Sequence, residues 1–247
     1  PQQDGGQWDM LVALIEKYGV VPQSAYPESQ ASSHSAEFNR SYNGKLRKDA
    51  ITLRKLVAAN AAQAEIDEKL AQFGRENYHM LSLTFGEPPV TFDFSYRDKD
   101  NNFHREQAIS PLDFFAKYVG WELSDYISII NAPTADKPFN QTYNVKMLGN
   151  VSGGREVKHL NLDLATFKDL AVKQLVAGEN VWFGVDMGPK LDRKAGLMDT
   201  KFVNEDDLFD VDFSMTKVER LEYGVPLMTH AMVLTGVVLV DGQPTMW

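Results

Sequence analysis

The chain has 247 residues, of which 43% are hydrophobic and 24% charged, a composition typical of a globular protein large enough to bury a core. Asp and Glu number 34 against 25 Lys and Arg, and this formal charge of −9 argues against nucleic acid as the main partner, because an acidic chain gains little from counterion release at a phosphate backbone. Cysteine is absent, which excludes disulfides, thiolate metal ligands and a cysteine nucleophile within these residues.

The sequence predicts neither a membrane segment nor a secretory leader. Its longest apolar run, residues 231–240, is interrupted by Thr235 and Gly236 and is far shorter than the roughly 20 residues that a membrane helix needs. The first ten residues, PQQDGGQWDM, contain neither the basic region nor the apolar segment of a leader peptide.

Residues 7–18 are predicted to form an amphipathic helix, because apolar residues recur at the spacing of one helix face and Gly19 follows as a stop signal. The members of this apolar stripe are Trp8, Leu11, Val12 and Ile15. Prolines at 22 and 27 then favour an extended, turn-rich segment. The proline-free stretch 45–85 is rich in helix-forming residues and predicts two or more consecutive helices.

A β-hairpin is predicted next, because residues 90–96 alternate apolar and polar side chains and a turn separates them from a second strand at 103–109. Ser110 and Pro111 then form a strong helix-start signal, and Gly120 ends this helix.

The second half of the chain is predicted to be richer in strands. We expect them at residues 126–131, 143–148, 157–162 and 181–186, with a helix at 163–177 and a loop at 188–215. From Val233 an apolar strand leads to Asp241-Gly242, which is a hairpin signal. Helices in the first half and strands in the second indicate an α+β protein.

Sequence signatures of cofactor and metal chemistry are missing, so we predict no cofactor and no metal site. The chain has no glycine-rich nucleotide-binding loop, no HExxH zinc motif and no GxSxG nucleophile elbow. Residues 98–102, DKDNN, resemble half of a calcium-binding loop, but Phe103 stands where such a loop needs glycine. A solvated hairpin turn is therefore the favoured interpretation.

His230 directly precedes the apolar run 231–240. The other four histidines show no pairing at the spacing of metal ligands. On the residues alone, His230 also defaults to a structural role.

Several motifs, in order along the chain, change that interpretation. The segment DGGQWDMLVALIEKYGVVPQSAYP and the segment THAMVLTGV resemble the glycine-pair helix and the catalytic-histidine strand of papain-like cysteine peptidases. DGGQWDM, VWFGVDMG and LMTHAM resemble most closely the bleomycin hydrolase or aminopeptidase C family. The resemblance covers essentially the whole chain and implies an incomplete papain-like α+β fold, with a helical first half and a β-barrel-like second half.

Three regions follow from this resemblance. Residues 1–30 would belong to the helical papain-like domain and contain the glycine pair that binds substrate. Residues 31–125 would form a family-specific, mostly helical insertion with a hairpin, and residues 126–247 the barrel-like domain with the catalytic histidine.

The resemblance also implies roles for five residues. His230 matches the catalytic histidine, which acts as general acid and base. Gly5 and Gly6 match glycines whose backbone bonds an extended substrate peptide, although a tight turn before the helix would also use glycine. Trp8 and Ala231 match positions that flank the pocket for a substrate side chain, although Trp8 also belongs to the apolar stripe.

In this family the nucleophilic cysteine and the oxyanion-hole glutamine precede the DGGQWDM motif. The asparagine that orients the histidine follows the point that Trp247 occupies. The chain is therefore expected to be the central portion of a longer peptidase, inactive by itself because His230 has no thiol to activate.

The implied parent protein is a cysteine aminopeptidase that removes N-terminal residues from peptide substrates, and a cytoplasmic homohexamer. An alternative of another class stays open, namely a non-catalytic papain-like relative that binds peptides or partner proteins without hydrolysing them. The missing cysteine fits both interpretations.

Overall fold

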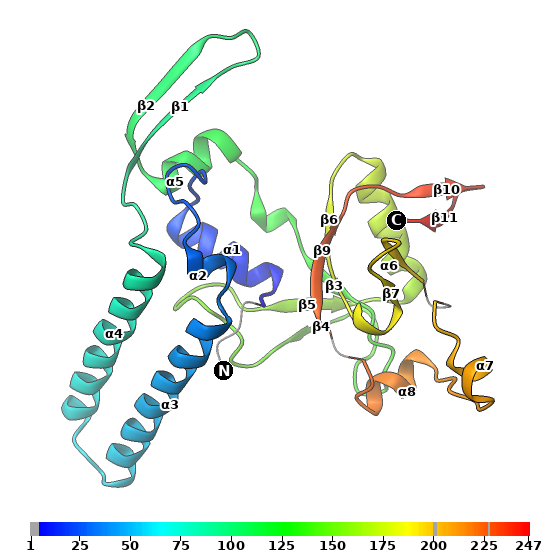
Figure 1. The fold of residues 1–247 in the computed structure, drawn as a ribbon, viewed down its shortest axis with the longest axis horizontal. Helices are drawn as coiled ribbons and strands as arrows, with labels where there is room; N and C mark the ends of the chain where they lie inside the picture. Colours follow the sequence, from blue (N-terminus) through cyan, green and yellow to red (C-terminus); the bar gives the residue numbers. More distant parts are fainter. Residues whose placement is uncertain (1–4, 200–201, 227) are drawn as a thin grey trace. The chain divides into compact units, whose positions relative to one another are not determined.

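The computed structural model describes residues 5–199, 202–226 and 228–247 (Figure 1). The chain divides into two compact units. The first comprises the residues up to Leu123 together with Asn150–Arg155, and the second comprises Ser124–Gly149 and Glu156–Trp247. Every helix in the described ranges is too short or too polar to cross a lipid bilayer. The domain boundaries expected at residues 30 and 125 stay predictions.

Helix α1 (Trp8–Tyr18) confirms the first predicted helix. Gly19 closes it with a φ of 75° and donates its N–H to the carbonyl of Ile15. A β-carbon at Gly19 would lie 2.2 Å from the backbone of Pro111. This position therefore requires glycine for its conformation and for space.

The buried face of α1 differs from the predicted stripe. Val12 is fully buried, but Leu11 is 40% exposed, and Asp9 lies in the interior at 6% exposure. Arg155 forms ion pairs with Asp9, at 3.7 Å, and with Glu16. A charged partner from a distant segment covers a polar side of the helix, which apolar periodicity could not reveal.

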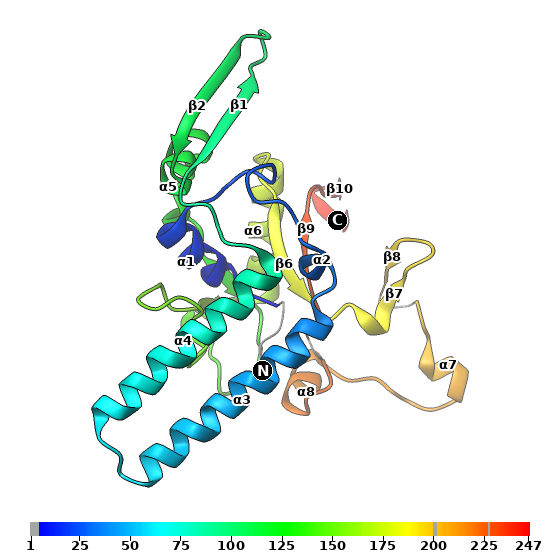
Figure 2. The same cartoon turned by 60° about the vertical axis from the view of Figure 1, so that its left-hand side comes forward.

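Helices α3 (Ala36–Ala58) and α4 (Gln63–Phe85) run side by side as a helical hairpin, preceded by the short helix α2 (Gln30–Ser33) (Figures 1 and 2). The prediction placed the first helix near residue 45, whereas α3 begins at Ala36. Residues 36–44 contain Ser, Asn and Gly, which favour helices weakly. The ring of Phe38 packs edge-on against Phe85, with centroids 4.9 Å apart, and this packing overrides the weak propensity.

A polar cluster lies in the seam between α3 and α4. Asp49 is 6% exposed, and its two carboxylate oxygens accept hydrogen bonds from Lys45 at 2.6 and 2.7 Å. Asn77 of α4 donates to the same carboxylate at 3.2 Å, and Glu76 forms an ion pair with Lys45 at 2.7 Å. Desolvation by itself would lower the pKa of Lys45, but the hydrogen bonds to Asp49 and Glu76 outweigh it and raise that pKa.

Strands β1 (Phe92–Arg97) and β2 (Phe103–Ile109) pair antiparallel and confirm the predicted hairpin. At its base, the rings of Phe92 and Phe94 pack edge-on against Phe114, with centroids 5.3 and 4.9 Å apart. These contacts join the hairpin to the helix that follows it.

That helix, α5 (Pro111–Phe114), begins at the predicted signal, because the Ser110 hydroxyl accepts a hydrogen bond from the N–H of Asp113 at 3.1 Å. It continues as a π-helical turn (Phe115–Val119) and ends at Gly120, as predicted. A short 3-10 turn (Leu123–Asp125) follows.

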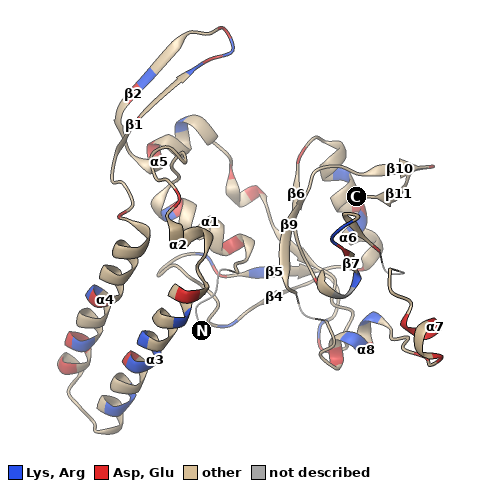
Figure 3. Cartoon of the chain, viewed as in Figure 1, with Lys and Arg blue, Asp and Glu red and all other residues tan. Residues whose placement is uncertain are grey.

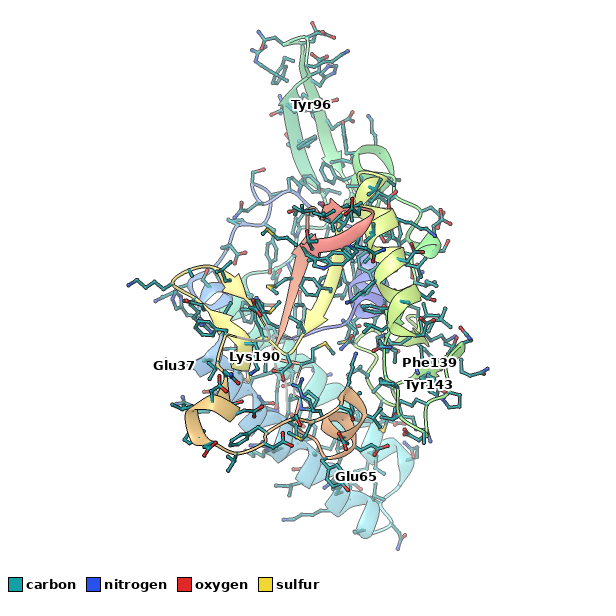
Figure 4. The ribbon with its side chains drawn as sticks, turned by 90° about the vertical axis from the view of Figure 1, so that its right-hand side faces the viewer. Glu37, Glu65, Tyr96, Phe139, Tyr143 and Lys190 are labelled. Carbon is teal, nitrogen blue, oxygen red and sulfur yellow. The ribbon has the colours of Figure 1, made fainter. Side chains whose placement is uncertain are left out.

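The turn between β1 and β2 is built around Asp98. Its carboxylate accepts hydrogen bonds from the backbone N–H groups of Asp100 and Asn102, both at 2.9 Å, and from Nε2 of His104 at 2.8 Å. His104 stacks on Tyr96, labelled in Figure 4, with ring centroids 4.9 Å apart. The bond from His104, followed by the bond from Asn102, lowers the pKa of Asp98 to about 2. The carboxylate thus organises a hairpin turn.

In the second unit, strands β3 (Ser128–Ile130), β5 (Lys158–Asn161) and β4 (Gln141–Asn144) form one sheet in that order. The central strand β5 is parallel to β3 and antiparallel to β4. Strand β4 ends earlier than the predicted strand 143–148, because Met147 adopts a φ of 60°, which turns the chain out of the sheet.

Asn161 fastens the connection between β3 and β4 onto β5. It is fully buried, and its side-chain oxygen accepts from the N–H of Ala132 at 2.8 Å. Its amide donates to the carbonyls of Ala132 and Lys137 at 2.9 and 2.7 Å. Every hydrogen-bonding direction of this buried side chain except one acceptor site is therefore used.

Helix α6 (Leu164–Val176) confirms the predicted helix, with Asp163 accepting from the N–H of Thr166 at 3.0 Å and Gly178 following at a φ of 88°. Residues 188–215, predicted as a loop, contain short elements. These are a 3-10 turn (Gly188–Lys190), β7 (Leu191–Asp192), β8 (Leu197–Met198) and α7 (Glu205–Phe209). Acidic residues begin α7 (Figure 3), and helix α8 (Lys217–Glu222) follows.

Strands β10 (Val238–Val240) and β11 (Gln243–Met246) form the predicted hairpin, with Asp241 and Gly242 at φ values of 51° and 76°. The strand predicted to run unbroken from Val233 into this hairpin is wrong. Residues 235–237 leave the strand, and β9 (His230–Leu234) instead pairs with a distant strand, a partner that no local turn signal could indicate.

The architecture is a mixture of helices and small sheets. Among the described residues each sheet contains two or three strands, and none closes on itself.

Candidate active site

The candidate site lies on a two-stranded antiparallel sheet of β6 (Val181–Val185) and β9. Residues directly opposite each other share a face, so β6 and β9 present one half-buried apolar face and one exposed face. The first face contains Val181, Phe183, Val185, Met232 and Leu234, with His230 at its end. A sheet of only two strands leaves Trp182 and Gly184 of β6 exposed.

His230 is the first residue of β9 and is exposed, opposite Val185. The preceding residue, Thr229, donates its N–H to the carbonyl of Val185 at 3.2 Å, and its hydroxyl accepts from the N–H of Met187 at 3.4 Å. No described residue is placed in a hydrogen bond with the imidazole. Thr229 therefore serves the backbone of the neighbouring strand, while the imidazole is left accessible.

Ala231 lies on the opposite face of β9 from His230 and is exposed, across from Gly184. A β-carbon at Gly184 would lie 2.3 Å from the sulfur of Met228. Gly184, which lies opposite Ala231, is therefore closely approached by Met228. Both residues stand within the motifs VWFGVDMG and LMTHAM, but the motifs indicated no role for either, because only non-local pairing brings their strands together.

The other predicted site residues belong to the first unit. Gly5 and Gly6 are exposed, and a β-carbon on either would meet no described atom within 4 Å. Trp8 is half-buried at the first position of α1, and Asp4 of the DGGQWDM motif lies outside the described residues.

Charged residues surround the end of β6. Asp186 follows the strand directly, and its carboxylate lies 3.8 Å from the guanidinium of Arg220 in α8. Lys217, on the same helix, is exposed as a residue, yet desolvation of its ammonium, followed by the nearby charge of Arg220, lowers its pKa. No group of three or more potential metal ligands occurs within the described part of the chain.

The sequence profile of the Peptidase C1-like family matches residues 1–247. This chain belongs to that family. Among its relatives are the aminopeptidases C of Lactobacillus delbrueckii subsp. lactis and Streptococcus thermophilus, 52% and 53% identical over the full chain. The resemblance inferred from the motifs is thereby confirmed.

A solved member of the family has nearly the same fold. The crystal structure of PepW from Lactobacillus rhamnosis HN001 is 63% identical, with a TM-score of 0.95 over 99% of this chain. The chain spans 55% of that protein and 55% to 56% of the two aminopeptidases C. The roles of Gly5, Gly6, Trp8, His230 and Ala231 stay predictions.

Proposed function

We propose that the whole protein containing this chain is a cysteine aminopeptidase, with His230 as its general acid and base. The observation that carries the proposal is an accessible histidine at the first position of β9, in a chain that matches a peptidase family throughout its length. Relatives named aminopeptidase C, about half identical, supply the reaction class and the peptide substrates.

In the proposed reaction, a thiolate attacks the carbonyl carbon of the first peptide bond. The imidazolium of His230 gives its proton to the departing amine, and an acyl-enzyme is left. The neutral imidazole then takes a proton from water, which attacks the thioester and releases the amino acid. The chain has no cysteine, so the thiol must come from residues outside it.

Gly5 and Gly6 are proposed to bond the substrate backbone, since open space around both leaves room for a peptide. Trp8 and Ala231 are proposed to flank the pocket for a substrate side chain. In the whole protein, we propose that the strands of the second unit complete a barrel-like domain. The cytoplasmic location and the homohexamer rest on the family resemblance.

The proposal is tested with the whole protein and with the 247-residue chain, each given an aminoacyl fluorogenic amide. We expect turnover by the whole protein, abolished by a thiol-directed inhibitor, and none by the chain alone. A whole protein whose turnover survives complete thiol alkylation would contradict the proposal.

The absence of cysteine also fits a second candidate, a non-catalytic relative that binds peptides. The coding sequence on either side of these residues separates the two candidates. A cysteine upstream of the DGGQWDM motif supports the peptidase, and its replacement by another residue supports the binding protein.

A further inference from the structure

We propose that helix α8 positions His230, by tying the end of β6 to the sheet of β3, β4 and β5 through Arg220 and Lys217. This inference rests on the proposed function. Neither residue was singled out by the sequence, and neither touches the reacting atoms, so both are positioning residues.

One end of α8 is anchored on the larger sheet. The ammonium of Lys217 donates to the side-chain oxygen of Asn131 at 2.6 Å. The amide of Asn131 donates to the carbonyl of Leu162 at 2.8 Å, and the N–H of Leu162 donates to the carbonyl of Ile130 at 2.9 Å. Asn131 directly follows β3 and Leu162 directly follows β5, so Lys217 reaches a junction that both strands hold.

The second contact of α8, through Arg220, reaches the end of β6 next to His230. The guanidinium of Arg220 forms the ion pair with Asp186, whose side chain is only 18% exposed. Asp186 follows Val185, which lies opposite His230, and Met187 is held by the hydroxyl of Thr229. Arg220 thus fixes the point where β6 ends, and that point faces the residue where β9 begins.

Helix α8 is short but closed at both ends. At its start, Thr216 and Glu219 form a capping box, in which the hydroxyl accepts from the N–H of Glu219 at 3.2 Å and the Glu219 carboxylate accepts from the N–H of Thr216 at 2.7 Å. At its end, the N–H of Val225 donates to the carbonyl of Arg220 at 2.9 Å. A helix closed in this way can hold two side chains at a fixed spacing.

The functional consequence follows from the geometry of proton transfer. A general acid must lie within hydrogen-bond reach of the atom that it protonates, and a displacement of about 1 Å can cost about 100-fold in rate. Releasing the end of β6 would move the imidazole, whereas three of the four proposed substrate-binding residues, Gly5, Gly6 and Trp8, belong to the other unit. The expected loss is therefore chiefly in kcat, with a much smaller change in KM.

The test uses the whole protein with Arg220→Gln, Lys217→Met and the isosteric Asp186→Asn. We expect kcat to fall about tenfold in each, with KM within about twofold. Alkylation of the active-site thiol by iodoacetamide at mildly acidic pH should also slow, because a displaced imidazolium stabilises the thiolate less. Arg220→Lys should restore part of kcat. The matched control is Lys173→Gln, which breaks the Asp169–Lys173 pair of 2.7 Å on α6 and should leave both readouts unchanged.

The inference is overturned if Arg220→Gln and Asp186→Asn keep wild-type kcat and alkylation profiles, or if their losses follow the melting temperature and recur in Lys173→Gln. His230→Ala separates this failure from that of the proposed function. An active His230→Ala protein ends the proposed function, whereas an inactive one beside a fully active Arg220→Gln protein ends only the role of α8.

Discussion

The seam between α3 and α4 and the sheet of β6 and β9 treat polar side chains in opposite ways. In the seam, Asp49 is buried and compensated by Lys45 and Asn77. In the sheet, the imidazole of His230 is exposed at the end of an apolar face, and the described residues give it no hydrogen bond. A buried polar group costs stability unless it is paired, whereas an exposed polar group can stay bonded to water and needs no partner in the protein. The stability of the fold therefore explains the polar cluster in the seam, whereas the position of His230 is explained by its proposed contact with the substrate and the thiol.

The largest expected effect tests the exposed side of this contrast. In the whole protein, His230→Ala should lower kcat by at least about 10²–10⁴-fold, the contribution typical of a single general acid–base group. The imidazole serves both thiolate formation and leaving-group protonation, so its loss affects both steps. Unfolding free energy should change by no more than about 0.5 kcal/mol, since an exposed side chain leaves no cavity. Steady-state kinetics and thermal melting measure the two quantities.

His79→Ala is the matched control, because His79 is an exposed histidine in the middle of α4. It should keep both activity and melting temperature. A His230→Ala protein that melts several degrees lower would show that the imidazole supports the fold, and the contrast with the seam would then be broken.

The next largest effect tests the buried side. Asp49→Ala removes the acceptor that Lys45 and Asn77 share, and should destabilise the α3–α4 hairpin by about 2–3 kcal/mol, because two half-buried donors lose their partner. Faster amide hydrogen exchange confined to α3 and α4 would report the loss, with turnover per folded molecule unchanged. The control is Asp169→Ala, which removes the exposed ion-pair partner of Lys173 on α6 and should change amide hydrogen exchange little. Equal effects from both substitutions would contradict the importance of burial.

Local signals in the sequence located the elements whose ends are set by neighbouring residues. The stop at Gly19, the start at Ser110 and the start of α6 next to Asp163 all depend on bonds within a few residues, and the sequence placed each of them to within a residue. The start of α3 was missed because it depends on Phe38 packing against a ring at the far end of α4. Tertiary contacts of this kind leave no periodic trace.

The site followed the same division. The roles of His230 and the glycine pair are predicted from family motifs alone, since their local surroundings resemble those of any exposed residue. The pairing of β9 with β6 places Ala231 opposite Gly184, and a separate ion pair with Asp186 brings Arg220 to the end of β6. Contacts between distant segments decide such neighbours, and one sequence does not encode them in its spacing.

The smallest predicted effect concerns Asp98, an intermediate case between the two regions, because its carboxylate is exposed to solvent in part yet fully bonded. Its pKa lies at about 2, against an ordinary value of 3.8, because His104 and then the N–H of Asn102 stabilise the charged form. A carboxylate whose pKa is lowered by folding stabilises the fold above its unfolded pKa, and this contribution is lost as the pH falls from about 3.8 through about 2. Carbon-13 NMR of labelled aspartate should therefore give a midpoint near 2, and His104→Ala should move it upward. A wild-type midpoint at the ordinary value would show that exposure alone, without regard to bonding, sets how a polar group behaves in this molecule.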